Sequence, residues 1–175
     1  TMVYFNLTEE YYIDYTEKGI VDYKVQLKEN DFYDDEWLEK DQAYVASLIK
    51  SILADLDYEM NMGADVDFKY KYSVIANLKI VDNDTNRDIL NKPYVIKEEA
   101  VYSKTDTNKL AISETININY GYYNELNTQF LEKFALSDTT STLVVSMKVE
   151  VIGSSEHFES DAQNASTINL NIPLT

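Results

Sequence analysis

Cysteine is absent from this chain of 175 residues, so neither a disulfide framework nor thiolate chemistry is available to it. Its absence does not identify a compartment. Histidine occurs once, as His157 in the polar segment 154–160, where we expect it to be exposed to solvent. A single histidine leaves too few nitrogen and sulfur ligands for a zinc site and nearly excludes serine–histidine catalysis.

A long hydrophobic run is missing as well. No segment approaches the roughly 20 apolar residues that a membrane-spanning helix needs, and none has the pattern of a signal peptide. The chain begins Thr1-Met2-Val3 and ends in the strand-like segment 168–175. We therefore expect it to be an excised part of a longer protein.

Basic residues are few, with 15 Lys and Arg against 31 Asp and Glu, which gives a formal net charge of −16. A field of this sign repels phosphate backbones and anionic lipid headgroups, so nucleic-acid and membrane-surface binding are not expected. It favours solubility and, more weakly, cations or basic partners.

Glycine and proline are also scarce, at four and two residues, whereas tyrosine occurs 15 times. Aromatic residues suit the pleated surface of a β-sheet, and scarce glycine means that hairpins must turn on Asn and Asp. The length and the hydrophobic content of 45% predict one folded domain over residues 1–175.

Residues 66–81 alternate between apolar and polar side chains, which predicts a long strand with one buried and one wet face. The row Phe68, Tyr70 and Tyr72 falls on the apolar face. Sixteen extended residues would span about 50 Å, so the strand must twist or bend. Ile75 breaks the alternation, which predicts a bulge within 73–76.

Further strands are predicted at 21–27, about 51–60, about 94–102, 115–120, 143–151 and 168–174, with an edge strand or extended arm in 3–15. Gly63 and the polar segments 82–88, 103–108 and 153–166 are predicted to be turns or loops. Tyr123, Leu126, Phe130, Leu131 and Phe134 recur at helical spacing, which predicts one amphipathic helix near 122–135. The expected fold is mainly β: an antiparallel β-sandwich, immunoglobulin- or fibronectin-like or jelly-roll-like, with one helix.

Five segments also resemble a family of uncharacterised proteins from Gram-positive bacteria, a domain of unknown function. They are 23–30 (YKVQLKEN), 69–74 (KYKYSV), 118–124 (INYGYYN), 146–151 (SMKVEV) and 168–174 (INLNIPL). The resemblance implies a domain held outside the cell membrane by hydrophobic segments that lie beyond it. It implies no catalytic residues.

Asp82, Asp84, Asn86 and Asp88 have the alternate oxygen spacing with which calcium-binding loops begin. Arg87 stands where such a loop has glycine, and no glutamate closes the loop at its twelfth position. The segment is also expected to join two strands. A solvated hairpin turn is therefore favoured over a calcium site, and no other cofactor is expected.

Two further groups of residues are candidate sites. One is an acidic patch of Asp31, Asp34, Asp35 and Glu36, near Asp55 and Asp57, which is more typical of a solvated face. The other is an aromatic platform for sugar rings, made by Tyr120, Tyr122 and Tyr123 or by Phe32, Tyr33 and Trp37. Core packing is the favoured account of these aromatic side chains, and no pair of carboxylates is singled out for catalysis.

These observations predict a non-enzymatic structural or interaction module on the outer side of a bacterial cell membrane, tethered there by segments outside this chain. Its expected partner is a protein or a cell-wall polymer. The alternative is a carbohydrate-binding or calcium-assisted adhesion module. The oligomeric state and the ligand are left open.

Overall fold

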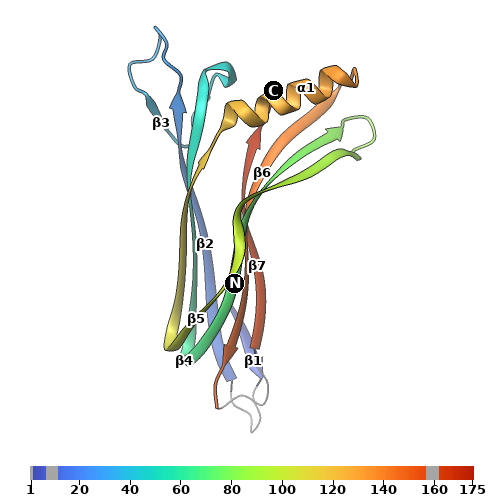
Figure 1. Cartoon of the computed structure of the whole chain (residues 1–175). Helices are drawn as coiled ribbons and strands as arrows, with labels where there is room; N and C mark the ends of the chain where they lie inside the picture. The colour runs from blue at the N-terminus through green and yellow to red at the C-terminus, as the bar shows by residue number, and fades with distance from the viewer. Residues whose placement is uncertain (1, 7–11, 157–161) are drawn as a thin grey trace.

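A computed structural model describes the backbone of residues 2–6, 12–156 and 162–175, and His157 lies outside this part. The elements are β1 (Met2–Asn6), β2 (Tyr12–Leu27), β3 (Trp37–Glu39), the 3₁₀ helix η2 (Ala46–Leu48), β4 (Ile49–Asp82), β5 (Asp88–Ile118), α1 (Tyr120–Lys133), β6 (Thr139–Ser154) and β7 (Ala162–Pro173) (Figure 1). No helix in the described part is long and apolar enough to cross a membrane.

The strands form one antiparallel sheet of seven strands, with the order β1-β2-β4-β6-β7; β3 pairs with β2, and β5 pairs with β4. The mainly β prediction with one helix is confirmed. Two separate sheets are not seen, because β4 and β5 hydrogen-bond to each other along both halves of the molecule.

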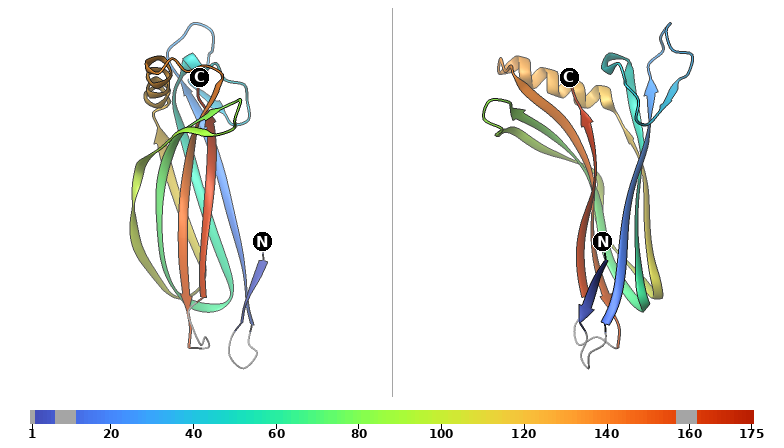
Figure 2. Two further views of the ribbon diagram at one scale, coloured as in Figure 1. Left: turned by 90° about the vertical axis from the view of Figure 1, so that its right-hand side faces the viewer. Right: turned by 180° about the vertical axis from the view of Figure 1, so that it is seen from behind.

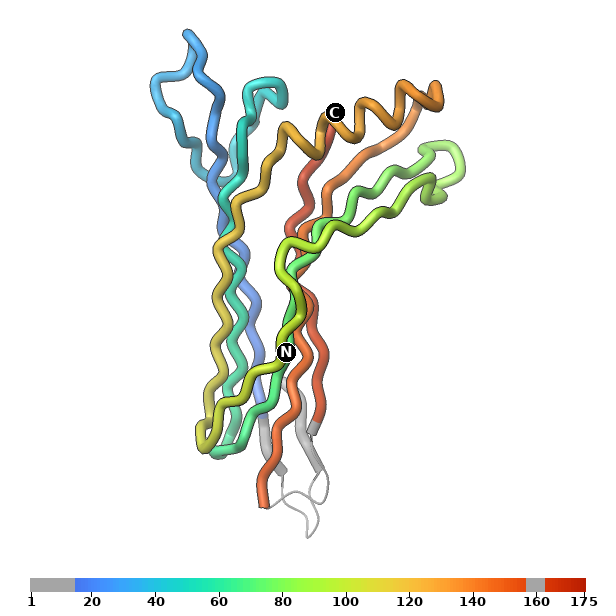
Figure 3. Tube along the Cα trace, viewed as in Figure 1, coloured from blue at the N-terminus to red at the C-terminus, as the bar shows by residue number. Residues whose placement is uncertain are grey.

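β4 is one continuous strand of 34 residues that folds back on itself. Its first half pairs with β2 and its second half with β6, and its register with β5 breaks between Asn61 and Val66. Figure 3 shows β4 running down one side of the molecule and up the other. The predicted turn at Gly63 is therefore wrong, because this segment bends while the strand continues on both sides of it.

β5 follows the same bend in the opposite direction. The segment 103–108, predicted as a turn between two strands, lies inside β5. Asp106 has a φ of 50°, and its N–H donates to Asp67 Oδ1 at 2.8 Å. This contact joins β4 and β5 at the bend, where both strands turn together without ending.

The two bends divide the sheet into two arms, which face each other. The first arm holds β2, β3, residues 49–62 of β4 and residues 107–118 of β5. The second arm holds residues 66–82 of β4, residues 88–104 of β5, β6 and β7. Figure 2 shows the arms joined at one end and diverging at the other, where α1 crosses between them.

One hydrophobic core fills the space between the arms. Leu56 from the first arm and Val74 and Val145 from the second have no exposed surface. Phe68 and Tyr72 are buried, so the alternation that the sequence showed sorts inward from outward residues correctly. The predicted bulge is confirmed too, because the β4–β5 register shifts between Tyr72 and Ile75.

α1 covers the diverging ends of the arms. It begins after Asn119, whose side-chain oxygen accepts the N–H of Tyr122 at 3.1 Å and caps the helix. Its buried side chains are Tyr120 and Asn127, whereas Phe134, predicted to be on the buried face, is 56% exposed. Asn127 is fully buried, and its Nδ2 donates to the carbonyl oxygen of Thr175 at 3.3 Å.

The polar loop predicted for 153–166 is shorter than expected. β6 continues through Ser154, and β7 already begins at Ala162. The β6–β7 register places Ala162 opposite Gly153, Gln163 opposite Ile152 and Asn164 opposite Val151. Backbone pairing overrides the polar composition of this segment.

Candidate functional site

The most site-like region of the described chain is a seam where β2 of the first arm meets β7 of the second. The two strands face each other from opposite arms and are in contact, but no hydrogen-bonded ladder joins them. Three zones follow one another along this seam: a polar cluster, a close backbone approach and an apolar cleft.

The polar cluster is centred on the carboxylate of Glu17 in β2. Glu17 Oε2 accepts hydrogen bonds from Tyr58 OH at 2.8 Å, Asn164 Nδ2 at 2.8 Å and Ser166 Oγ at 2.7 Å. Tyr15 OH donates to Asn164 Oδ1 at 3.0 Å. Since Asn164 and Ser166 belong to β7, this cluster fastens the two arms together.

Burial of Tyr58, followed by its hydrogen bond to Glu17, raises the pKa of the phenol well above its ordinary value. Tyr58 is 3% exposed as a residue, so its hydroxyl is largely shielded from water. A neutral donor facing a carboxylate is a stable pairing, and we read the cluster as a structural clasp.

Gly19 marks the second zone, where the backbone of β2 lies against the side chain of Ile168 in β7. A Cβ atom built on Gly19 would lie 2.9 Å from Ile168 Cγ1. Any larger residue would have to displace the side chain of Ile168, so glycine is favoured here for close approach and not for an unusual backbone angle.

An apolar cleft of about 330 Å³ opens above this contact, where the arms begin to diverge. Twelve residues line it, none of them charged: Tyr23, Val25, Tyr44, Ala46, Ile49, Ile52, Tyr120, Leu170, Asn171, Ile172, Pro173 and Thr175. Ligand pockets run from roughly 300 to 1,000 Å³, so this cleft has room for a few side chains.

The opposite side of the molecule has a second clasp, where the two halves of β5 face each other. Glu114 Oε1 accepts the hydroxyl of Tyr72 at 2.7 Å and pairs with Lys97 Nζ at 3.2 Å. Tyr70, Tyr72 and Tyr102 stack beside it, with centroids 5.3–6.4 Å apart. Burial and then the bond to Glu114 raise the pKa of Tyr72.

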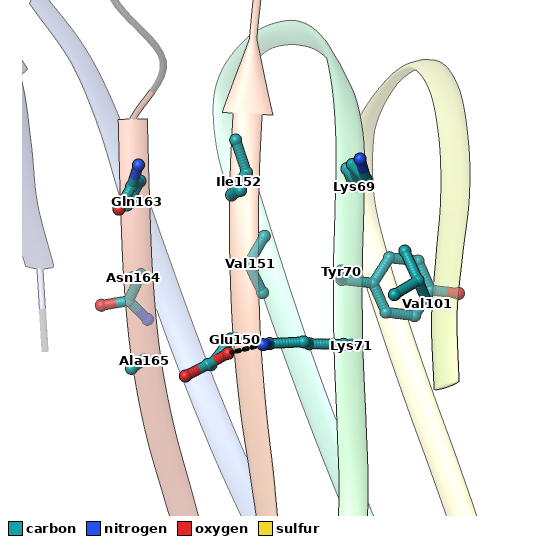
Figure 4. Close-up of a pocket in the computed structure, with 10 residues that line it drawn as sticks. All are labelled: Lys69, Tyr70, Lys71, Val101, Glu150, Val151, Ile152, Gln163, Asn164 and Ala165. Atoms are coloured by element: carbon teal, nitrogen blue, oxygen red, sulfur yellow. Dashed lines mark ion pairs between the residues drawn. The ribbon is translucent and has the colours of Figure 1, made fainter. Parts of the chain in front are cut away.

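A larger hollow of about 460 Å³ lies on the second arm over β4, β5, β6 and β7 (Figure 4). Its charged groups satisfy one another: Lys71 Nζ lies 2.9 Å from Glu150 Oε2 and 3.6 Å from Glu99 Oε1. These ion pairs are exposed to solvent, where such pairs are weak. We consider it a weaker candidate than the seam.

The calcium candidates Asp82, Asp84, Asn86 and Asp88 lie in the hairpin between β4 and β5. The carboxylate of Asp82 accepts Thr85 Oγ1 at 2.8 Å and the N–H of Asp84 at 3.3 Å, so it holds the turn together. Asn86 supplies the positive φ of 57° that the turn requires. Calcium binding there stays a prediction.

The acidic patch predicted from sequence is not assembled. The loop with Asp31, Asp34, Asp35 and Glu36 is exposed, whereas Asp55 and Asp57 lie on β4 and accept Thr115 Oγ1 and Ser113 Oγ at 2.7 and 2.5 Å. Within the described residues, no three His, Cys, Asp or Glu side chains are grouped so as to hold a metal ion.

The side chains of the two predicted aromatic platforms are arranged differently. Tyr120 is buried at 2% exposure, and Tyr122 and Tyr123 meet edge to face, so these three do not form a flat surface. Phe32 is 87% exposed beside Tyr33, but Trp37 is half-buried under Lys24, whose Nζ lies 4.9 Å from the ring centroid.

No protein-family model matches the chain, and no curated protein matches it in sequence. The resemblance to a Gram-positive surface family therefore stays a prediction.

Sequence reasoning did not find the seam. Its residues are ordinary members of strands by composition, and nothing in the local sequence distinguishes Glu17 from a solvent-facing acid. The one available signal was Gly19, a glycine inside a strand-forming segment, which marks a close approach of another backbone or side chain.

Proposed function

We propose that this chain is a non-enzymatic interaction module of a bacterial surface protein, placed on the outer side of the cell membrane by segments outside it. Its binding site is the cleft between β2 and β7. The observation that carries this proposal is the uncharged lining of a cleft that opens directly at a strand edge. Apolar concave surfaces with a few polar groups at the rim are the usual form of binding sites.

The polar rim supports the same proposal. Tyr44 OH donates to the carbonyl oxygen of Glu39 at 2.5 Å, and the hydroxyl of Tyr23 accepts the N–H of Asp41 at 3.2 Å. These bonds fix two aromatic side chains at the mouth of the cleft before a partner arrives. Rigid aromatic side chains give up little entropy on binding.

The experiment is a selection of binders from a random linear peptide library on the folded protein, followed by affinity measurement on two variants. Ala46→Trp places a large ring in the cleft, and Ser47→Trp places the same ring on the exposed neighbouring position. We expect Ala46→Trp to weaken binding by roughly tenfold or more and Ser47→Trp to leave it unchanged. Failure to select any peptide that Ala46→Trp affects would overturn the proposal.

The non-enzymatic part has its own test. We expect no turnover of cell-wall glycans or peptides by the protein. Turnover that is abolished by one carboxylate substitution, such as Glu17→Gln or Glu114→Gln, would show an enzyme instead.

A second candidate is a carbohydrate-binding or calcium-assisted adhesion module, and the exposed Phe32 favours it. Calorimetry with calcium and a glycan array distinguish it from the first proposal, because silence in both removes it. We also retain the β-sandwich as a proposal for the fold: the two arms bury a common core as facing layers, although their strands hydrogen-bond as one sheet.

A further inference from the structure

The free edge of β7 forms one wall of the cleft. β7 ends the strand order of the sheet, and β6 is its only ladder partner within the described residues. Four consecutive residues from Leu170 to Pro173 line the cleft, although successive side chains point to opposite faces. The cleft is therefore lined by the backbone of β7 as well as by its inward side chains.

The direction of the backbone groups follows from one hydrogen bond. Leu174 N–H donates to the carbonyl of Ser141 at 3.0 Å. The β6–β7 register pairs Thr142 with Pro173, so the next pair along the two strands is Ser141 and Leu174. In an antiparallel pair, hydrogen-bonded residues alternate with residues whose groups point away. Leu170 and Ile172 thus bond to β6, whereas Asn169 and Asn171 present their N–H and C=O groups to the free edge.

Pro173 agrees with this alternation. Its carbonyl accepts the hydroxyl of Tyr120 at 3.2 Å, so it points away from β6. Its missing N–H falls on the unpaired side, where proline is tolerated in a strand. The outward N–H and C=O groups on this edge of β7 are therefore those of Asn169 and Asn171.

We propose that the cleft accepts an extended segment of a partner protein, which adds to the edge of β7 as a further antiparallel or parallel strand. This inference rests on the proposed function and names the partner's chemistry. Strand addition uses main-chain hydrogen bonds for affinity and pockets at alternate side chains for specificity. The cleft supplies both, because Val25, Ile49 and Ile52 of the first arm face the inward side of such a strand.

The charge of the chain defines the outward side chains of that segment. The cleft lining is uncharged, so every second residue of the segment is apolar. The remaining residues face the solvent around a protein with a formal net charge of −16, which attracts lysine and arginine. The occupant is thus a segment in which apolar and basic residues alternate.

Hydrogen exchange measured by NMR on the protein with a selected library peptide tests the binding mode. In the free protein, the amides of Leu170 and Ile172 are expected to exchange slowly and those of Asn169 and Asn171 quickly. With peptide bound, Asn169 and Asn171 are expected to slow by roughly tenfold or more. Binding that Ala46→Trp abolishes but that leaves both asparagine amides fast would refute strand addition and leave the proposed function standing.

Backbone substitutions give a second measurement. Asn171→Pro removes one outward N–H without removing a bond to β6, and Asn171→Ala keeps that N–H. We expect Asn171→Pro to weaken the peptide roughly tenfold more than Asn171→Ala does, while both variants remain folded by circular dichroism. N-methylation at alternate peptide residues should weaken binding with one parity only, and equal effects at both parities would count against the proposal.

A second copy of this chain is the competing occupant. In that case Asn169 and Asn171 would already be protected without peptide, in proportion to protein concentration, and sedimentation would show a dimer. That result would overturn the assignment of a basic partner segment.

Discussion

Removing the Glu17 carboxylate tests whether the seam is fastened as the structure indicates. Glu17→Ala takes the acceptor from three donors, of which Tyr58 OH is the most deeply placed. Asn164 and Ser166 are half-buried, so water can replace the carboxylate as their partner, and losing these two hydrogen bonds costs little. The hydroxyl of Tyr58, on a residue 3% exposed, is left without its partner at a cost of about 1–3 kcal/mol.

Adding about 1 kcal/mol for the two weaker bonds gives an expected loss of about 2–4 kcal/mol in the free energy of unfolding. For a domain of this size, 1 kcal/mol corresponds to roughly 2–4 °C in Tm, so the expected drop is roughly 4–16 °C. Thermal unfolding followed by circular dichroism measures it. Lys18→Ala, a substitution at the exposed neighbour, is the matched control and should change stability by less than about 0.5 kcal/mol.

A double-mutant cycle with Tyr58→Phe assigns the loss to the Tyr58–Glu17 bond. The summed loss in unfolding free energy of the two single variants should exceed the loss in the double variant by about 1–2 kcal/mol, because both substitutions remove the same hydrogen bond. Strict additivity, or a drop in Tm no larger than that of Lys18→Ala, would refute the role of Glu17 as a clasp between the arms.

Four further predictions follow from other parts of the structure. Glu114→Ala should lower stability by about 1–2 kcal/mol and add to the effect of Glu17→Ala in urea unfolding, since the two clasps lie on opposite sides of the core; strong coupling would count against separate clasps. Gly19→Val should destabilise the protein through the 2.9 Å approach to Ile168, whereas Gly121→Ala, with its nearest neighbour atom at 3.7 Å, should stabilise it by about 0.5 kcal/mol, both read from Tm. Leu56→Ala should cost about 3–4 kcal/mol in denaturant unfolding, because the side chain is fully buried; a loss below about 1 kcal/mol would contradict the core assignment. The raised pKa values of Tyr58 and Tyr72 predict that the folded protein is sensitive to alkali. Stability is intact below about pH 10 and falls as the pH rises above it, because the phenols of the unfolded state then lose protons that those of the folded state retain. The urea midpoint should therefore fall less steeply with pH in a Tyr58→Phe, Tyr72→Phe double variant.

Alternation along the chain predicted the strands correctly because it is a local property. Residues 66–81 sort into inward and outward faces as the sequence indicates, and the bulge falls where Ile75 breaks the pattern. The helix was placed within two residues of its bounds, since its spacing of apolar residues is likewise local.

Continuity of the strands was not predictable in the same way. Gly63 and the segment 103–108 are typical of turns by composition, yet they lie inside β4 and β5. The two segments bend together, and each keeps hydrogen bonds with the other on both sides of the bend. That outcome depends on residues some 40 positions apart, such as Asp67 and Asp106.

The sequence alone determined the class of the protein: an acidic, cysteine-free, antiparallel β domain with one helix, whose inward residues can be read from a period of two. Only the tertiary structure decided that the sheet folds into facing arms, that Glu17 and Glu114 fasten its two sides, and that an uncharged cleft opens along β7. The physical reason is that each of these features joins residues from distant segments. A carboxylate in a strand has the same local sequence whether it faces water or a buried tyrosine of another strand.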